Sequence, residues 1–344
     1  MKPVRLQDVA DLAGVSAKTV SRVVNREPRV SPATREKVLK VIEDLNYRPN
    51  KSAQSLAADR SLLIGLLYDN PSAAYVTALQ EGVLRACDNS GYGLVIHPCD
   101  HRDPDLLKKI GTLITSTRLD GVVLSPPFTE NRALLNMFEE YETSFVLVSP
   151  LDQKQSNPLV FSDDVSAARE VMQHLLDLGH RRIGFIRGLK GRSGSEMRFE
   201  GYRQALRDSG IGFDPLLVAD GHFTFEAAER GARELLALDV PPTAIFASSD
   251  YMAAGALKAA IRLKISVPEE LSICGFDDNP VSRHLTPTLT TVSHPVPRLA
   301  EQAGQLLITH LKKNAPAVDL TPVVAQLIVR ESTARAPDET VPAT

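Results

Sequence analysis

Long apolar stretches and closely spaced cysteines are both missing from this sequence. The longest apolar runs, such as Leu62–Tyr68 and Gly121–Leu124, are far shorter than the roughly 20 residues of a membrane-spanning helix. The first residues, Met-Lys-Pro-Val-Arg-Leu-Gln-Asp, lack the apolar core of a secretion signal. Cys87, Cys99 and Cys274 have neither paired nor metal-ligand spacing, so we expect free thiols in the core. These absences predict a cytoplasmic protein in a reducing compartment.

The sequence also lacks the motifs of several enzyme classes. It has no Gly-rich phosphate loop of the Walker type, no Gly-x-Ser-x-Gly turn and no paired His/Cys metal spacing. Glycines do cluster in residues 188–194, but Lys190, Arg192 and Ser193 fit a mobile loop at a cleft equally well. We therefore expect no enzyme activity, no cofactor and no metal. The alternative class is a solute-binding module without DNA function.

Charge is unevenly distributed along the 344 residues, which carry a net charge of −3. Residues 1–60 contain 12 Lys and Arg against 7 Asp and Glu, a net of +5, so the remainder carries −8. The composition, 43% hydrophobic and 24% charged, is ordinary for a folded chain with more than one domain. A basic first part on an acidic body indicates that one end binds a polyanion.

Two short apolar-periodic segments in residues 6–25 predict a helix-turn-helix. Gly14 accepts the turn between them, Ala10 allows the helices to approach, and Val20 packs the second helix against the first. Ser16 is placed to cap the second helix. This spacing is typical of DNA-binding proteins, although helical hairpins of other proteins imitate it.

A third helix is predicted from Ser31 toward Tyr47. Ser31 caps it and Pro32 occupies its first turn, while Val38 and Ile42 belong to an apolar stripe that also includes Leu45. Three small helices then enclose a core, and the second helix is left to face the major groove.

The second helix and its flanks supply the predicted DNA contacts. Lys18 and Arg22 can donate to guanine O6 and N7, whereas Ala17 offers only a methyl group. Residues suited to phosphate contacts, which fix the position without reading sequence, are Ser16, Thr19, Ser21, Asn25 and Arg29. The alternative for each polar residue is simple surface exposure.

A hinge is expected between the head, residues 1–49, and the body. Pro49 ends the third helix, Asn50 can cap a new one, and residues 51–58 are helix formers for about two turns. A helix of that length is unstable alone in water. The hinge and linker, residues 50–61, should therefore become ordered only when something supports them.

From residue 62 to residue 333, short aliphatic strands alternate with helices. Predicted strands are Leu62–Tyr68, Leu94–His97, Gly121–Leu124, Phe145–Val148, Arg182–Ile186, Ala244–Ala247 and Leu271–Phe276, followed by the strand-like run Val324–Arg330. Predicted helices include Ala73–Asn89, Val165–Leu178, Phe225–Leu238 and Met252–Ile261. This order predicts an α/β body of doubly wound parallel sheets in two lobes, with a cleft at the carboxyl ends of the strands. Lobe 1 is assigned about residues 62–161 plus 292–322, and lobe 2 about 162–291 plus 323–333.

Polar residues directly after the predicted strands are the candidates for ligand binding. They are Asp69, Asn70, Ser125, Ser149, Ser249, Asp250, Asp277 and Asp278. Carboxylates and hydroxyls in a cleft can hydrogen-bond the vicinal hydroxyls of a sugar. For Asp250 and Asp277 the alternative is helix capping.

The motifs together resemble those of the lactose-repressor (LacI/GalR) family. The resemblance runs through Asp-Val-Ala, Ala-Gly-Val-Ser, Thr-Val-Ser-Arg-Val-Val-Asn, Leu-Asn-Tyr-Arg-Pro-Asn and Ala-Gln-Ser-Leu-Ala in the first 57 residues. It continues in Leu-Gly-His-Arg-Arg-Ile-Gly-Phe-Ile, Arg-Phe-Glu-Gly-Tyr and Cys-Gly-Phe-Asp-Asp, and so covers nearly the whole chain. It implies a repressor that binds a palindromic operator as a homodimer and is switched allosterically by a small molecule. In the paired hinge helices, Leu56 would intercalate in the minor groove and Ala53 would pack at the dyad.

The resemblance also implies roles in the cleft. Arg198 and Asp277 match the effector-contacting positions of the family, and Phe223 falls near an aromatic residue that stacks on sugar. Ser249 stands where many relatives have asparagine, and Ser149 where a member has aspartate. The effector is therefore expected to be a sugar or oligosaccharide, with a nucleobase or sugar phosphate left open. Residues 334–344 are predicted to be a disordered tail without leucine heptads, which favours a dimer.

Overall fold

The computed structural model describes residues 4–24, 29–47, 60–88, 90–312 and 323–337. They group into two compact units that divide between Leu62 and Leu63. Among these residues, no helix is long and apolar enough to cross a membrane.

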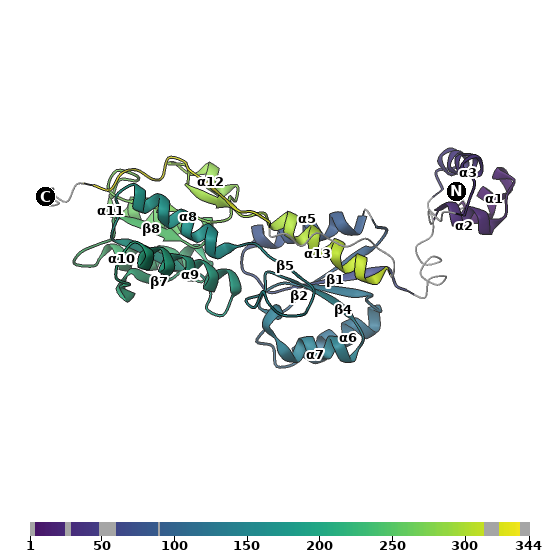
Figure 1. Cartoon of the computed structure of the whole chain (residues 1–344), viewed down its shortest axis with the longest axis horizontal. Helices are drawn as coiled ribbons and strands as arrows, with labels where there is room; N and C mark the ends of the chain where they lie inside the picture. The colour runs from purple at the N-terminus through teal and green to yellow at the C-terminus, as the bar shows by residue number, and fades with distance from the viewer. Residues whose placement is uncertain (1–3, 25–28, 48–59, 89, 313–322, 338–344) are drawn as a thin grey trace. The chain divides into compact units, whose positions relative to one another are not determined.

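The first unit contains the three predicted helices, α1 (Leu6–Ala13), α2 (Ala17–Val24) and α3 (Pro32–Asp44) (Figure 1). Gly14 ends α1 in the left-handed conformation, with φ 60°, which a side chain would strain. The Ser16 hydroxyl accepts a hydrogen bond from the Thr19 amide at 3.1 Å, which confirms the predicted cap. A small apolar core holds the helices together and consists of Val9, Ala10, Ala13, Val20, Val23, Val38 and Tyr47.

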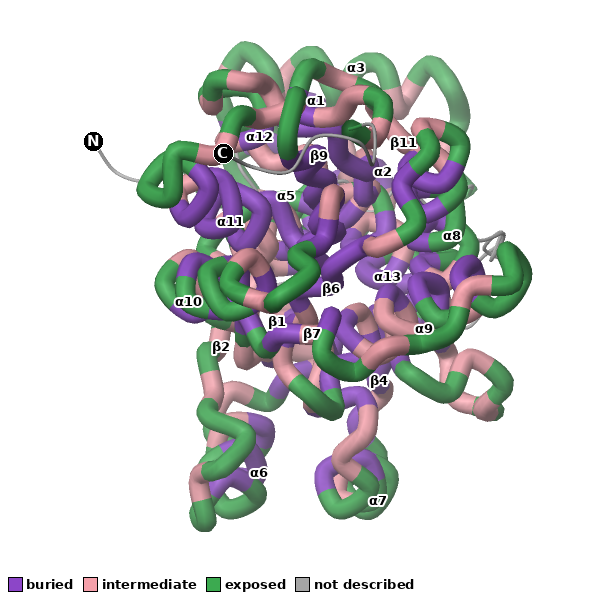
Figure 2. Tube along the Cα trace, turned by 90° about the vertical axis from the view of Figure 1, so that its left-hand side faces the viewer, coloured by how far each residue is buried: buried purple, intermediate pink, exposed green. Residues whose placement is uncertain are grey.

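The second unit contains two parallel sheets (Figure 1), of which the first forms lobe 1. Its strand order is β2-β1-β3-β4-β5. The strands are β1 (Leu63–Tyr68), β2 (Gly93–Pro98), β3 (Gly121–Leu124), β4 (Ser144–Val148) and β5 (Leu159–Val160). The helices are α5 (Ala73–Asp88), α6 (Leu106–Thr117), α7 (Arg132–Glu140) and α13 (Val296–Leu311). Figure 2 shows that α6 and α7 each have a buried and an exposed side, as expected of helices that cover a sheet.

Helices α5 and α13 pack closely against each other on the same lobe. A Cβ atom at Gly82 of α5 would lie 2.2 Å from the Pro297 carbonyl oxygen, so only glycine permits this approach. The C-terminal helix α13 thus belongs to lobe 1, although the segment before it belongs to lobe 2.

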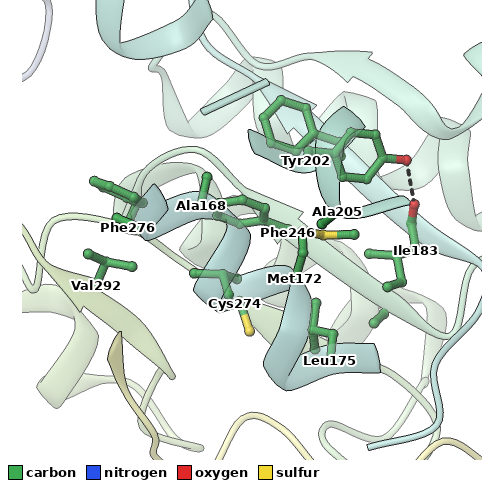
Figure 3. Close-up of a cluster of buried hydrophobic side chains, with 14 of the residues drawn as sticks. Ala168, Met172, Leu175, Ile183, Tyr202, Ala205, Phe246, Cys274, Phe276 and Val292 are labelled. Atoms are coloured by element: carbon green, nitrogen blue, oxygen red, sulfur yellow. Dashed lines mark hydrogen bonds between the residues drawn. The ribbon is translucent and has the colours of Figure 1, made fainter. Parts of the chain in front are cut away.

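The second sheet, in the order β7-β6-β8-β9, forms lobe 2. Its strands are β6 (Ile183–Arg187), β7 (Val218–Asp220), β8 (Ala244–Ala247) and β9 (Ser272–Cys274). Its helices are α8 (Asp164–Asp177), α9 (Ser193–Asp208), α10 (Phe225–Leu236), α11 (Asp250–Leu263) and the short α12 (Val281–His284). The core between this sheet and helices α8 and α9 is drawn in Figure 3, where the Tyr202 hydroxyl donates to the Ile183 carbonyl at 2.9 Å. Helices α10 and α11 cover the opposite face.

The chain crosses between the sheets beside a small antiparallel pair, β10 (Thr291–Ser293) with β11 (Gln326–Ile328). The first crossing joins β5 to α8 at residues 161–163, and the second joins β10 to α13 at residues 294–295. Ser162 pairs with Val323 in a parallel bridge, so the returning segment lies beside the first crossing. These two crossings connect the lobes of the second unit.

The predicted elements agree with the structure to within a few residues, but the prediction that the tail is disordered from residue 334 is wrong. The strand predicted at residues 271–276 is shorter, and the strand-like run at residues 324–330 narrows to β11. The tail is not disordered from its first residue, because Ala334 donates to the Ser272 hydroxyl at 3.0 Å and Ala336 to the Leu178 carbonyl at 2.9 Å. The buried His180 also contacts the Ala334 carbonyl at 3.1 Å. Residues 334–337 are therefore fixed by polar groups of lobe 2, and residues 338–344 lie outside the described part.

Candidate functional site

A cavity lies between the carboxyl ends of the two sheets and holds about 730 Å³ of empty space, part of it open to solvent. Residues from both lobes and from both crossings line it. They are Asn70, Pro71, Ser72, Tyr75, Pro126, Ser149, Ser162, Asp164, Leu189, Arg192, Ser193, Gly194, Met197, Arg198, Phe223, Ser249, Asp277 and His294. Its mixture of apolar walls with a few polar groups is typical of small-molecule sites.

Six of the eight predicted effector residues line this cavity. They are Asn70, Ser149, Arg198, Phe223, Ser249 and Asp277. Ser249 has a second task, because its hydroxyl caps α11 by accepting from the Met252 amide at 3.3 Å.

Asp69 and Ser125 are not brought to the cavity wall, contrary to the prediction. Ser125 is fully buried, and its hydroxyl faces the Leu67 carbonyl at 3.4 Å. The Asp69 carboxylate accepts from the backbone and the ring of His101, at 2.9 and 2.5 Å. Both residues therefore lie at the expected edge of the sheet. Hydrogen bonds to His101 and to Leu67, which are distant in sequence, hold their side chains away from the cavity wall.

Asp250 and Asp278 are also engaged elsewhere. Asp250 is fully buried and accepts from the Thr291 hydroxyl at 2.5 Å and the Asn279 amide at 2.7 Å. Asp278 accepts from Arg283 and Arg330, both at 2.5 Å. Both carboxyls therefore fix the loop after β9, and neither lines the cavity.

Arg198 is the centre of a buried charge network in the cavity wall. Its Nε donates to Asp164 Oδ2 at 3.0 Å, and its Nη1 donates to the Ser248 carbonyl at 2.7 Å. The same Nη1 lies 3.4 Å from Asp277 Oδ1, and the guanidinium covers the Phe276 ring at 3.7 Å from its centroid. The network joins the starts of α8 and α9 to the carboxyl ends of β8 and β9.

The pKa values of the two carboxyls in this network are shifted in opposite directions. Burial raises the pKa of Asp164, but the charges of His294 and Arg198 and hydrogen bonds from His294 and Ser162 outweigh it and hold that pKa far below its usual range. Burial raises the pKa of Asp277 above its usual range, against the opposing effect of Arg198. Asp164 is therefore the fixed anion of the pair, and Asp277 is the one whose charge responds to its surroundings.

Arg192, at the N-terminal end of α9, connects lobe 2 to lobe 1. Its Nη1 donates to the carbonyls of Asp69 and Pro126 at 2.6 and 2.7 Å, and its Nη2 lies 3.5 Å from the Asp69 carboxylate. Ser193 adds a hydrogen bond to the Ser149 carbonyl at 2.6 Å. These contacts close one side of the cavity. From the sequence, Arg192 and Ser193 were expected only as residues of a loop at the cleft.

Other residues of the site were missed because they belong to the crossings. Ser162 and Asp164 lie at the first crossing and His294 at the second, so no strand end identifies them. The one sequence signal that could have identified any of them was the position of Asp164 directly before the predicted helix Val165–Leu178. Tyr75, from the start of α5, completes the wall.

One group of side chains in the described residues has metal-ligand geometry. Ligand atoms of Asp69, Asp100 and His101 lie within 4.8 Å of one another. The His101 ring nitrogen is already 2.5 Å from the Asp69 carboxylate, and Asp100 and His101 are exposed. Their mutual hydrogen bond accounts for this arrangement.

In the first unit, α2 exposes part of the predicted DNA-reading surface. Lys18 is exposed, and Arg22 and Ser21 are half-buried. Ala17 is also half-buried and packs against the core of the three helices, which limits the methyl contact expected of it. Ser16 and Thr19 share a hydroxyl hydrogen bond at 2.9 Å, and Arg29 is exposed. The remaining predicted contacts, Asn25, Asn50, Ala53 and Leu56, lie outside the described residues.

Comparison with known proteins supplies the family. Residues 5–50 match the model of bacterial regulatory proteins of the lacI family, and residues 172–333 match a periplasmic binding protein-like domain. The ribose operon repressor of Halalkalibacterium halodurans is 34% identical over 95% of this chain and 96% of its own length.

Solved structures agree with these matches. A complex of the transcriptional regulator CelR with cellobiose is 31% identical, with a TM-score of 0.71, and the match covers 96% of this chain and 99% of that one. A lac repressor dimer bound to operator and the anti-inducer ONPF is 27% identical, with a TM-score of 0.78, over 97% and 100% of the chains. These relatives are transcriptional regulators, which agrees with the expectation that the chain is not an enzyme. The chain belongs to the LacI family of DNA-binding transcription regulators.

Proposed function

We propose that the cavity binds a neutral sugar or oligosaccharide, and that this effector changes the affinity of a homodimer of the protein for a palindromic operator. The observation that carries the proposal is the pairing of both cavity arginines. Arg198 is paired with Asp164 and Asp277, and Arg192 with the Asp69 carboxylate and two carbonyls.

Paired arginines make the cavity a poor site for an anion. A phosphate or carboxylate needs an uncompensated cation to offset the cost of leaving water. Here it would meet the carboxylates of Asp164 and Asp277 beside Arg198, and that of Asp69 beside Arg192. A sugar hydroxyl, which both donates and accepts, can use the carboxylate of Asp277 and the guanidinium of Arg198 at the same time.

The apolar part of the wall also favours a sugar ring. Phe223 lines the cavity and packs against the Gly188 backbone, where a Cβ atom would lie only 2.2 Å from the ring. Such a ring is held in one orientation, as a stacking platform requires. Leu189 and Met197 extend the apolar surface beside it.

The printed names of the relatives support the same class of effector. One relative is a repressor of a ribose operon, and a structural neighbour holds cellobiose. Another neighbour is a dimer on its operator. A regulator of this kind acts where the chromosome is, so we place the protein in the cytoplasm.

Arg192 indicates how the effector acts. It ties the lobes together across the cavity, so a ligand that contacts both walls has different affinities for different lobe arrangements. Residues 50–61 connect the lobes to the head, and paired copies of this hinge would transmit the change to DNA.

A ligand screen tests the proposal. The full chain is heated with D-ribose, D-glucose, cellobiose, ribose 5-phosphate, D-glucuronate and guanine, because a ligand of the folded state raises its melting temperature. A neutral sugar should give the shift, Asp277→Asn should lose it, and Asp208→Asn, at an exposed carboxylate of the same lobe, should keep it. A shift with only the anions or guanine would refute the neutral-sugar assignment.

The DNA side needs its own measurement. An operator selected from random duplexes should be palindromic, and its gel shift should weaken with salt and respond to the sugar found in the screen. A sugar that binds without changing operator affinity would contradict effector control.

A further inference from the structure

His294 carries a buried nitrogen that the described structure leaves without a hydrogen bond. Its side chain is 5% exposed and lines the cavity, and Nδ1 has no partner. Among the described residues the other such atoms are Arg187 Nε and Ser195 Oγ, and neither residue lines the cavity. A buried polar atom without a partner is costly, so an atom of this kind in a binding cavity points to a ligand.

The contacts of the other ring nitrogen show that it is protonated. The Ser162 hydroxyl donates its single hydrogen to Asp164 Oδ1 at 2.5 Å. His294 Nε2 lies 2.9 Å from the Ser162 oxygen and 3.3 Å from Asp164 Oδ1, and both oxygens can now only accept. Nε2 therefore carries a proton, and Nδ1 is the ring nitrogen that lacks a partner.

Nδ1 faces the Asp277 carboxylate. Asp277 Oδ1 lies 3.9 Å away, which is too far for a direct hydrogen bond. The charged and titratable groups around the ring are Asp164 on α8, Asp277 after β9, Arg198 on α9 and Tyr75 on α5. An unpartnered ring nitrogen beside a carboxylate and a guanidinium matches hydroxyl groups, because a hydroxyl can both donate and accept.

We infer that His294 is an effector contact whose Nδ1 hydrogen-bonds one hydroxyl of the sugar, while the Asp277 carboxylate accepts from the adjacent hydroxyl. The inference rests on the proposed function and narrows the ligand to a neutral compound with vicinal hydroxyls at this end. Arg198 donates to the oxygen of one of these hydroxyls, which completes the pattern. The raised pKa of Asp277, caused by burial, is lowered when a hydroxyl donates to it.

This contact also connects the ligand to the two crossings between the lobes. His294 belongs to the second crossing, and its Nε2 is bound to Ser162 of the first crossing. A hydroxyl on Nδ1 therefore fixes a ring that holds both crossings together.

A matched pair of substitutions separates the two faces of the ring. In His294→Gln the amide reaches the place of Nε2 and keeps the contact with Ser162 and Asp164, but no hydrogen-bonding atom remains at the place of Nδ1. In His294→Asn the side-chain oxygen takes the place of Nδ1, and the Nε2 contact is lost. We expect His294→Gln to melt like the wild type and to bind the probe sugar about 10-fold more weakly, the equivalent of one hydrogen bond. His294→Asn should melt lower and bind within a few-fold of the wild type.

Calorimetric titration of the full chain with cellobiose and with D-ribose provides the measurement. A deoxy analogue that lacks the contacting hydroxyl should bind wild type and His294→Gln equally. In nitrogen-15 spectra of the wild type, the resonance of His294 Nδ1 should shift when the sugar binds.

Each outcome is decisive. Unchanged sugar affinity in His294→Gln, or an Nδ1 resonance that does not move on sugar binding, overturns the inference and leaves the proposed function standing. If neither sugar binds the wild type and only anions do, the proposed function fails first, and the hydroxyl contact fails with it.

Discussion

Replacing Arg198 with methionine should destabilise the second unit strongly. Methionine keeps most of the buried stem but removes the cation that pairs with Asp164 at 3.0 Å and lies 3.4 Å from Asp277. Both carboxyls then stay in a poorly solvated wall without this cation. Breaking a buried ion pair from one side costs about 3–5 kcal/mol, and we expect a loss in the free energy of unfolding of that size.

The loss should depend on pH in a defined direction. The folded pKa of Asp277 is raised, so its charge is a penalty at neutral pH that is relieved as pH falls through that value. Removing Arg198 raises that pKa further, and the difference between wild type and variant should shrink on acidification. Asp164 behaves oppositely, because its lowered pKa gives stability that is present above its unfolded pKa and is lost as pH falls.

Urea unfolding followed by circular dichroism measures the loss, since the chain has no tryptophan for fluorescence. The double variant Arg198→Met/Asp277→Asn should recover part of it, because one of the two unpaired charges is gone. A loss below about 1 kcal/mol that is independent of pH would refute the reasoning, since it would mean that water already solvates these carboxyls.

Two further substitutions test other parts of the molecule. Asp250→Asn should lower the free energy of unfolding less than Asp164→Asn does, because burial and the charge of Asp277 raise the pKa of Asp250 and so disfavour its charged form in the folded state. A flatter curve of unfolding midpoint against pH between acid and neutral conditions should accompany it, and a loss as large as that of Asp164→Asn would contradict this. Arg22→Ala should weaken binding to the selected operator by about 1–3 kcal/mol per lost base contact and affect random DNA much less. Equal weakening on both DNAs would make Arg22 a phosphate ligand.

Local rules were sufficient for the elements of this fold. The cap at Ser16 and the glycine at Gly14 depend on residues within a few positions of them, and both occur as predicted. The parallel strands are aliphatic because both faces of each sheet are covered, and their centres were found for the same reason. Their ends were less certain, because strand ends depend on partner strands.

The site was only partly predictable, because strand ends identify an edge and not the direction of a side chain. Asp277 and Asn70 line the cavity, whereas Asp69, one residue before Asn70, turns toward His101. That choice depends on residue 101, which is distant in sequence. His294 and Asp164 were missed because they lie in or beside the crossings between the lobes, where the sequence has no periodic pattern.

The start of α9 holds the means of coupling the two lobes. Arg192, its N-cap, binds carbonyls at the carboxyl ends of lobe 1 strands, while Arg198, within its second turn, binds only groups of lobe 2. Separating the lobes must therefore break the contacts of Arg192 and can leave those of Arg198 unchanged. A ligand shifts such an equilibrium only through its differential affinity for the two arrangements. It follows that a sugar bound by Arg198 and Asp277 alone would occupy the cavity without switching the regulator, and that contact with the Asn70 wall is what makes a ligand an effector.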